Sequence, residues 1–241
     1  MALQVKHAFI VTSAINSKFG VFNPAQRLEQ TLGTIWSIKE RIPDAKIIVM
    51  EVCGTPVTEE QEQLLRSNSD IFIDCSREDD VQALYDNDNW DVVKNGTEIM
   101  CFGRVLSILQ EEKLLDGVDR VHKVSGRYIL NNKFDAELYE REELADRIII
   151  GPKHKSQFPI EITTVPLQYM ARLWSWPANI TDQVVKVYLD SFNFFAERLS
   201  QGGYVDIEHV LYKFLPTELI HEESELGIEG AIAPNGAPVK N

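Results

Sequence analysis

The sequence lacks the short motifs that identify the common α/β enzymes. No GxGxxG follows a predicted strand, and Walker A, GxSxG and HExxH sequences are all missing. A standard dinucleotide-binding fold is therefore unsupported, and most of the common α/β enzymes are removed from consideration. The five histidines show no close metal-ligand spacing.

Cysteine is scarce and long hydrophobic runs are absent. Cys53, Cys75 and Cys101 are far apart in the sequence, and none belongs to a CxxC pair. We expect buried, reduced thiols and a cytoplasmic protein. No run approaches the roughly 18 apolar residues of a membrane span, and the run 8–11 is too short for a signal peptide. We therefore expect no integral membrane contact.

Positive charge is in short supply. The chain has 24 Lys and Arg against 37 Asp and Glu, which gives a formal net charge of −13. This balance argues against non-specific binding to nucleic acid or to an anionic membrane, because both require a basic surface. A small anionic ligand stays possible, since a few local cations in a cleft can hold one.

The first 75 residues alternate between strand and helix patterns. Apolar runs rich in β-branched residues predict strands at 7–15, 45–52 and 70–75, and helical spacing of apolar residues predicts helices at 24–41 and 58–67. This alternation is typical of a parallel sheet with helices on its faces.

The rest of the chain has a more mixed pattern. We expect a mobile acidic connection at 76–93, with one helical turn, and a helix at 97–115. Further strands are predicted at 118–124, 147–151 and 160–165, the last followed by the start of a helix. Helices are predicted at 181–200 and 206–215, a charged helix or loop at 135–146, and a tail that drapes over the domain or frays.

Four stretches together resemble GT-A-type glycosyltransferases, in particular small bacterial- and virus-like sugar transferases. They are RLEQTLGTIWSIKERIPDAKIIVME (27–51), KNGTE (94–98), KVSGRYILNNKFD (123–135) and GIEGAIAPNG (227–236). The resemblance implies an α/β, GT-A-like single domain over 1–241, with a mostly parallel central sheet and helices on both faces. Residues 1–130 would be the nucleotide-sugar-binding half and 131–241 the acceptor-side half.

The resemblance also shows a departure from the family pattern. Where most GT-A enzymes carry Asp-x-Asp and bind a divalent cation, this chain has Ser125-Gly126-Arg127. The triplet has no carboxylate for a hard cation. We therefore expect no metal ligands and no cofactor, although a divalent metal stays possible. Arg127 would replace the cation and stabilise the departing diphosphate, Gly126 would allow close approach, and Ser125 would contact the substrate.

Candidate donor contacts follow the first two predicted strands. Ligands bind at the carboxyl ends of strands in this class of sheet, so Thr12, Ser13 and Asn16 are candidates to bind a base, or simply cap a loop. Arg27 could reach a phosphate or point into solvent. Glu51 could accept from a base or ribose, or be an ordinary surface acid.

Lys94 and Gly96 precede a predicted helix start at Thr97, where amide donors and an ammonium would favour an anion. Thr97 is then a plausible N-cap, which would also explain the segment structurally. Glu98 and Arg104 could equally be ordinary residues of that helix.

The base for acceptor activation is expected in the second half. Asp206 and Glu208 are the candidates, although Asp206 could be a structural N-cap. His209 is either a diphosphate contact or a core residue. Trp174 and Trp176 could stack on a sugar, although core packing is favoured for at least one.

The sequence thus predicts an enzyme that moves a sugar from a nucleotide-sugar donor to a glycan, glycoconjugate or other hydroxyl acceptor, with Arg127 and Lys94 stabilising the leaving diphosphate. No nucleic-acid partner is expected. The alternatives are a non-catalytic nucleotide-sugar or glycan-binding module and a metal-dependent nucleotidyltransferase. The latter requires paired carboxylates, and Asp70 and Asp74 only flank one strand.

Overall fold

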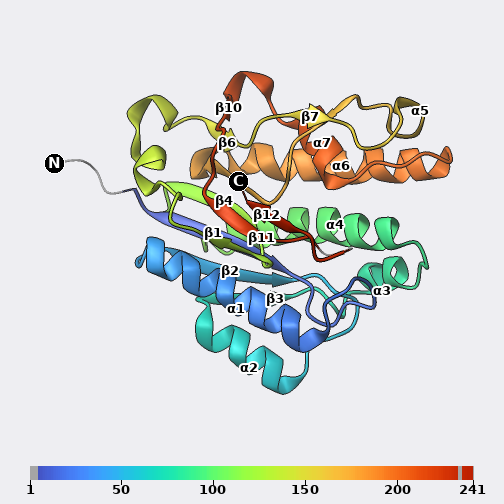
Figure 1. Cartoon of the computed structure of the whole chain (residues 1–241), viewed down its shortest axis with the longest axis horizontal. Helices are drawn as coiled ribbons and strands as arrows, with labels where there is room; N and C mark the ends of the chain where they lie inside the picture. Colours follow the sequence, from blue (N-terminus) through green and yellow to red (C-terminus); the bar gives the residue numbers. More distant parts are fainter. Residues whose placement is uncertain (1–4, 233–234, 241) are drawn as a thin grey trace.

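A computed structural model describes residues 5–232 and 235–240, and its centre is a seven-stranded sheet (Figure 1). The strand order is β10-β6-β9-β4-β1-β2-β3. The bounds are β1 (His7–Ser13), β2 (Lys46–Glu51), β3 (Ile71–Asp74), β4 (Arg120–Ser125), β6 (Ile148–Ile150), β9 (Leu173–Pro177) and β10 (Ile220–Glu222). Only β9 runs antiparallel to its neighbours β4 and β6, so the sheet is mostly parallel, as predicted.

Helices cover both faces of this sheet. One face carries α1 (Pro24–Arg41) and α2 (Glu59–Asn68). The other carries α3 (Asp79–Tyr85), α4 (Trp90–Glu111), α6 (Thr181–Ser200) and α7 (Ile207–Phe214) (Figure 1). Strand alternation divides the apolar residues between two cores: Ala8 and Ile10 of β1 face the α4–α6 side, whereas Phe9 and Val11 face α1.

The long, strongly periodic helices lie where the sequence predicts them. α1 begins after Asn23, whose side chain accepts from the backbone N–H of Gln26 in a capping box, and Pro24 occupies the first turn. Thr58 caps α2 in the same way. Helices α6 and α7 also fall within a residue of their predicted bounds.

The predicted start of the next helix is wrong. α4 begins at Trp90, seven residues before Thr97, and α3 fills part of the segment expected to be a connection. Asn89 caps the N-terminus of α4, because its side chain accepts hydrogen bonds from the backbone amides of Asp91 and Val92. Thr97 is consequently inside the helix, where its hydroxyl donates to the carbonyl of Val93.

The predicted strand at 160–165 is also wrong. A short helix, α5 (Ile160–Thr163), follows Pro159 and ends at Thr164, which has a left-handed φ of 57°. The helix predicted to start by residue 174 is replaced by β8 (Leu167–Gln168), which pairs with β7 (His154–Lys155), and then by β9. Residues 135–146 form two 3₁₀ turns, Ala136–Glu140 and Glu142–Leu144, and two more lie at Ala178–Ile180 and Thr217–Leu219.

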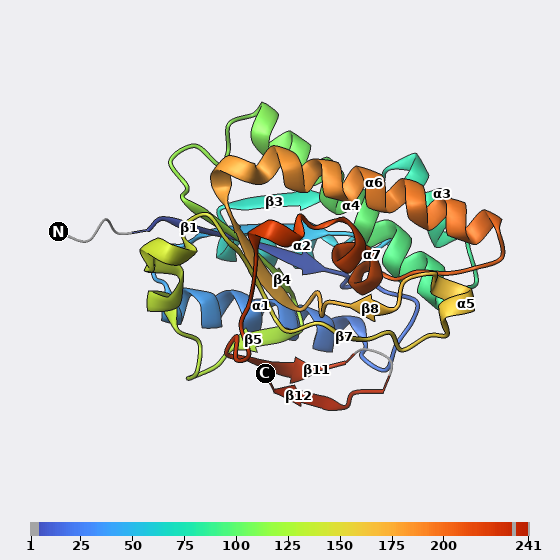
Figure 2. The same cartoon turned by 90° about the horizontal axis from the view of Figure 1, so that it is seen from above.

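The chain leaves the central sheet at Ser125-Gly126-Arg127. β4 ends at Ser125, and β5 (Tyr128–Leu130) joins a separate three-stranded sheet with β11 (Ile228–Ala231) and β12 (Pro238–Lys240). The predicted tail therefore lies against the domain as a hairpin (Figure 2). Of the GIEGAIAPNG stretch, 233–234 lie outside the described residues.

The three cysteines are buried and free, in agreement with the sequence prediction. No helix within 5–232 and 235–240 is both long enough and apolar enough to cross a membrane. The division of the chain into a donor half and an acceptor half stays a prediction.

Candidate functional site

Two joined hollows lie at the carboxyl ends of β1 and β4, the edge where ligands bind in such sheets. The first has about 740 Å³ of space and the second about 960 Å³, both counted with their open mouths. The first hollow is lined by Thr12, Ser13, Ala14, Ser17, Phe19, Arg27, Thr31, Val52, Cys53, Tyr85, Val93, Thr97 and Gly126. The second is lined by Asp91, Asn95, Lys123, Tyr128, Gln157, Phe158, Gln168, Met170, Ala171, Arg172, Tyr204, Asp206, Ile207, Glu208 and Ile232. Both share Trp90, Lys94, Glu98, Ser125 and Arg127.

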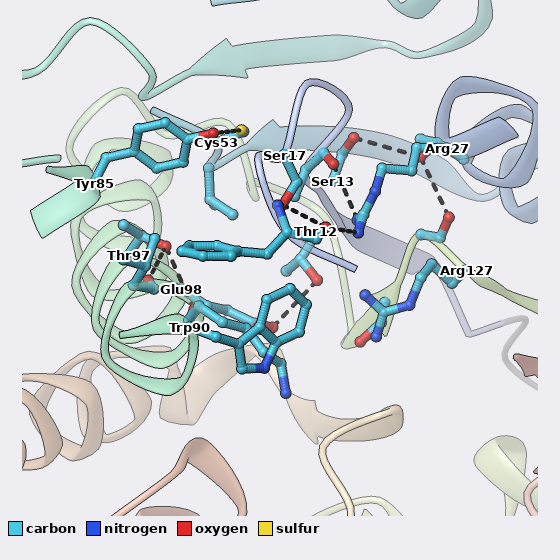
Figure 3. Close-up of a pocket in the computed structure, with 18 residues that line it drawn as sticks. Thr12, Ser13, Ser17, Arg27, Cys53, Tyr85, Trp90, Thr97, Glu98 and Arg127 are labelled. Carbon is cyan, nitrogen blue, oxygen red and sulfur yellow. Dashed lines mark hydrogen bonds between the residues drawn. The ribbon is translucent and has the colours of Figure 1, made fainter. Parts of the chain in front are cut away.

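Arg127 stands at the junction of the two hollows. Its side chain extends from the turn after β4 toward the first hollow (Figure 3). Within the described part of the chain its guanidinium has no acidic partner, and its buried Nε has no hydrogen bond. A cation in a cleft without a protein counter-ion is suited to bind an anion.

Gly126 brings the backbone close to β1. Its amide donates to the carbonyl of Thr12 at 2.8 Å, and its carbonyl accepts from the Thr31 hydroxyl at 3.3 Å. An added Cβ would lie 3.0 Å from both Thr12 O and Thr31 Oγ1. The glycine therefore lets the Ser125-Gly126-Arg127 turn pack directly on the end of β1.

A buried ion pair forms the floor of the cleft, and sequence reasoning missed it. Lys123 Nζ lies 2.8 Å from Glu98 Oε1, and its side chain is 1% exposed. The ammonium also donates to Ser125 Oγ and to the carbonyl of Ala171. Burial alone would raise the pKa of Glu98, but the charge and hydrogen bond of Lys123, together with the charges of Lys94 and Arg127, hold that pKa below its usual value.

Aromatic side chains form the walls of the first hollow. Phe19 and Trp90 meet edge to face, with ring centroids 5.4 Å apart, and Tyr85 lines the same hollow (Figure 3). The Tyr85 hydroxyl accepts from the amide of Lys18 and the hydroxyl of Thr55, so it ties the β1–α1 loop to the β2–α2 loop. No motif signalled these aromatic residues, because they lie on separate loops and elements.

Arg27 lines the first hollow but supports the loop. Its guanidinium donates to the carbonyls of Ala14, Phe19 and Phe22, and the residue is 4% exposed. Burial, and then the positive charge of Arg127, lowers the pKa of Arg27. Arg27 thus adds positive potential to the cleft, with its donors aimed at the β1–α1 loop.

Ser13 and Glu51 form a buried network beside the hollow. Ser13 Oγ donates to Glu51 at 2.7 Å, and the amides of Ile15 and Cys53 donate to the same carboxylate. Burial raises the pKa of Glu51 to about 7, against these hydrogen bonds. Glu51 is 0% exposed and lines neither hollow, so the network shapes the loop from behind.

Several predicted site residues lie outside both hollows. Asn16 donates to the carbonyl of Pro56 and exchanges hydrogen bonds with Gln61, which fixes two loops together. Gly96 packs inside α4, where a Cβ would meet Phe195 at 3.1 Å. Arg104 pairs with Asp80 on the surface.

Trp174 and Trp176 are both fully buried in the core, so neither faces a ligand. The carboxylates that flank β3 accept hydrogen bonds from backbone amides: Asp70 from Ile47, and Asp74 from Ser76. Because Asp70 and Asp74 lie at opposite ends of that strand, they do not form a metal-binding pair.

Lys94 lines both hollows from the second turn of α4. It is not at a helix N-terminus, so the predicted site of amides, helix dipole and ammonium does not form. Lys94 is instead the cation that opposes the raised pKa values of Asp91 and Glu208.

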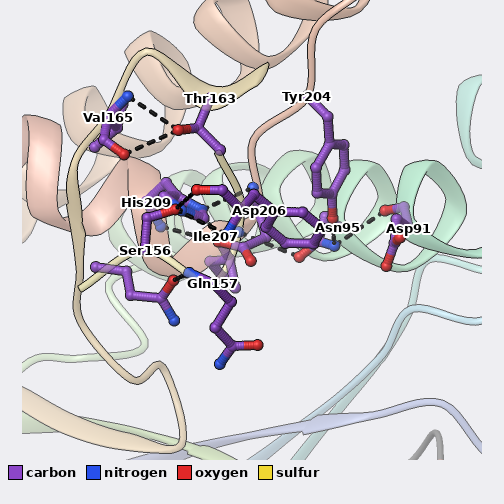
Figure 4. Close-up of polar contacts among 12 residues, drawn as sticks. Asp91, Asn95, Ser156, Gln157, Thr163, Val165, Tyr204, Asp206, Ile207 and His209 are labelled. Atoms are coloured by element: carbon purple, nitrogen blue, oxygen red, sulfur yellow. Dashed lines mark hydrogen bonds and ion pairs between the residues drawn. The ribbon is translucent and has the colours of Figure 1, made fainter. Parts of the chain in front are cut away.

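Asp206 and Glu208 both line the second hollow, but they differ in their partners. Asp206 is the N-cap of α7: it accepts from the amide of His209 and lies 2.5 Å from the His209 ring (Figure 4). The other ring nitrogen of His209 lies 2.8 Å from Ser156 Oγ, and His209 is 0% exposed and lines neither hollow.

The Glu208 carboxylate has no hydrogen-bond partner among the side chains of the described residues. Burial and then the charge of Asp206 raise the pKa of Glu208 to about 7. Next to it, Asn95 donates to the Tyr204 hydroxyl at 2.6 Å and accepts from the amide of Ile207, which anchors the start of α7 to α4 (Figure 4).

The residues of the turn do not fit a divalent cation. Ser125-Gly126-Arg127 offers no carboxylate, and Glu98, the acid shared by both hollows, is paired with Lys123. No cluster of three or more His, Cys, Asp or Glu side chains in 5–232 and 235–240 could hold a metal ion. We therefore derive no chemical step through a metal.

No family model and no curated protein matches the sequence. Among solved structures, the chain is similar to core-mannan synthase A from Aspergillus fumigatus in its Mn/GDP form, with a TM-score of 0.52 and 10% identity over 91% of this chain and 73% of that chain. A 4-diphosphocytidyl-2C-methyl-D-erythritol synthase from Anaerococcus prevotii DSM 20548 superimposes with a TM-score of only 0.43, at 13% identity over 91% of this chain and 86% of that chain. The protein has a GT-A-like α/β fold, as the sequence resemblance predicted.

Proposed function

We propose that the protein is a glycosyltransferase that moves a sugar from a nucleotide-sugar donor to a hydroxyl of a glycan or other acceptor without a divalent metal. The observation that carries this proposal is the unpaired Arg127 guanidinium at the junction of the two hollows. The fold similarity supports a nucleotide-sugar donor and not the metal-free part of the proposal, since the superimposed mannan synthase contains both Mn and GDP.

The first hollow suits the nucleotide. Phe19 and Trp90 offer aromatic surfaces for a base, and Arg127 and Lys94 line the same hollow. The diphosphate then lies between these two cations, and the sugar extends into the second hollow. Arg127 and Lys94 stabilise the negative charge that develops on the leaving diphosphate; one such donor contributes about 3–4 kcal/mol.

Glu208 is the better base of the two predicted carboxylates. Asp206 is held by the His209 ring and by the backbone amide that it caps, whereas the Glu208 carboxylate is free to accept a proton. The acceptor oxygen forms its bond to the anomeric carbon and loses its proton to Glu208. The bond to the diphosphate oxygen breaks, and its electron pair leaves with the diphosphate.

Titration with UDP, GDP and related nucleotides tests the donor site. We expect saturable binding of at least one of them, unchanged by EDTA, and at least a tenfold weakening in Arg127→Ala because the diphosphate loses its guanidinium. Arg141→Ala is the matched control, since Arg141 is exposed and pairs with Asp135 away from the cleft. Equal affinity of wild type and Arg127→Ala would refute the role of Arg127.

Turnover separates this function from the two alternatives. A glycosyltransferase releases nucleoside diphosphate from the sugar nucleotide, whereas a binding module of the same fold releases none over hours. A nucleotidyltransferase would require added divalent metal and would transfer a nucleoside monophosphate from a nucleoside triphosphate to its acceptor, with release of pyrophosphate.

A further inference from the structure

Arg172 is a third arginine of the cleft, after Arg27 and Arg127, and it lies on the side away from the first hollow. It directly precedes β9, and its carbonyl accepts from the amide of Ser125 at 2.9 Å, so its backbone lies beside the Ser125-Gly126-Arg127 turn. The side chain lines the second hollow and not the first, whereas Arg127 lines both. Arg172 is therefore placed beyond the diphosphate position, where the sugar extends.

The guanidinium of Arg172 has no hydrogen bond or ion pair with the residues that the structure describes. Its neighbour is the Tyr128 ring, whose centroid lies 5.7 Å from the guanidinium carbon, and the same ring lies 5.9 Å from that of Arg127. Arg27, by contrast, gives its donors to three carbonyls. The guanidinium groups of Arg127 and Arg172 are thus two positive charges close to the same buried ring, and their combined potential favours an anion between or beside them.

Among the described residues, none of the carboxylates of the second hollow forms an ion pair with Arg127 or Arg172. Glu98 is bound by Lys123, and Asp206 is held by His209. Lys94 is the cation that acts on Asp91 and Glu208. Arg127 and Arg172 are therefore two cations of the second hollow that take part in no ion pair with the described residues.

We propose that Arg172 binds a carboxylate or phosphate carried by a sugar in the second hollow, so that the enzyme acts on a negatively charged sugar. This inference rests on the proposed function, in which Arg127 is occupied by the leaving diphosphate. The planar guanidinium can donate two parallel hydrogen bonds to a carboxylate or a phosphate. An uncharged sugar offers no negatively charged acceptor for this pair of hydrogen bonds.

Inorganic phosphate, glucuronate and uncharged glucose are titrated into the protein, with and without saturating nucleoside diphosphate, and binding is followed by calorimetry. We expect phosphate or glucuronate to bind at least tenfold more tightly than glucose, and the stronger of the two identifies the anion. Arg172→Gln should lose this preference to within about twofold, whereas Arg172→Lys should keep part of it and Arg141→Gln all of it. Nucleoside diphosphate affinity should stay within about twofold in Arg172→Gln.

The inference is overturned if wild type shows no preference for either anion, or if Arg172→Gln keeps the preference. It is also overturned if Arg172→Gln weakens nucleoside diphosphate binding as much as Arg127→Ala, because Arg172 would then belong to the donor site. If wild type binds no nucleotide, the proposed function fails, and the titrations without nucleotide still decide whether Arg172 binds an anion. The midpoint of urea unfolding establishes that Arg172→Gln is folded. Arg172→Lys, which keeps the positive charge, provides a second test of the anion preference.

Discussion

Removing the ammonium of Lys123 should destabilise the protein strongly, because it isolates a buried carboxylate. All the contacts of the ammonium are internal: Glu98, Ser125 and the carbonyl of Ala171, at 2.7–2.8 Å. In Lys123→Met the Glu98 carboxylate keeps no ion pair: its remaining hydrogen bond is the weak one from Thr12, at 3.3 Å, and the charges of Lys94 and Arg127 act on it without direct contact. Methionine preserves the length and much of the volume of the lysine stem, so the change isolates the charge.

The expected loss is about 3–5 kcal/mol, the usual cost of breaking a buried ion pair by removing one partner. With a urea m-value of about 3 kcal/mol/M, the unfolding midpoint should fall by roughly 1–2 M. Lys186→Met is the matched control, because Lys186 pairs with Asp190 on the surface at 74% and 40% exposure. Such an exposed pair contributes about 0–1 kcal/mol.

A double-mutant cycle checks the cause. Glu98→Gln removes the charge that Lys123→Met leaves unpaired, so the double variant should be more stable than the sum of the two single losses predicts. A loss below about 1 kcal/mol in Lys123→Met, or full additivity in the double variant, would contradict the reasoning.

Two further predictions concern the turn and the base. Gly126→Ala should lower the free energy of unfolding in urea by about 1–3 kcal/mol, because the added Cβ would lie 3.0 Å from two oxygens. The control Gly33→Ala, in the middle of a helix with its nearest side-chain atom at 3.9 Å, should be neutral or stabilising. Equal effects of the two substitutions would contradict the close approach at Gly126. If Glu208 must be ionised to act as the base, kcat should rise with pH through about 7 and be about a tenth of its plateau at pH 6. Glu208→Gln should abolish this rise and Asp206→Asn should keep it; the reverse pattern would assign the base to Asp206.

The sequence predicted elements best where local chemistry and packing agree. α1 combines an Asn23 cap, Pro24 in its first turn and apolar residues at helical spacing, and it lies where it was expected. The start of α4 was misplaced because the acidic, polar stretch before it resembles a loop, and a single Asn89 side chain is enough to begin the helix there. At 160–165 the β-branched residues suggested a strand, but Pro159 and the left-handed Thr164 enclose a helical turn.

The sequence pointed to the Ser125-Gly126-Arg127 turn of the candidate site, but not to the contacts between side chains of different elements. Arg127 was singled out because Ser125-Gly126-Arg127 stands where most GT-A enzymes carry Asp-x-Asp, which is a difference within one short segment. The pairing of Lys123 with Glu98 joins a strand to a helix. Arg172 reaches the cleft only because β9 runs antiparallel beside β4. Periodicity describes one element at a time, so it does not report such neighbours.

The turn at Arg127 also links the middle of the chain to its far end. On one side of the turn Gly126 is bonded to Thr12, and on the other Tyr128 pairs with Gly230. The guanidinium is thus oriented by partners that are distant along the chain in both directions. Because contacts of wide sequence separation are costly to close, we expect the cleft to be completed late in folding, after the parallel strands have assembled around β1.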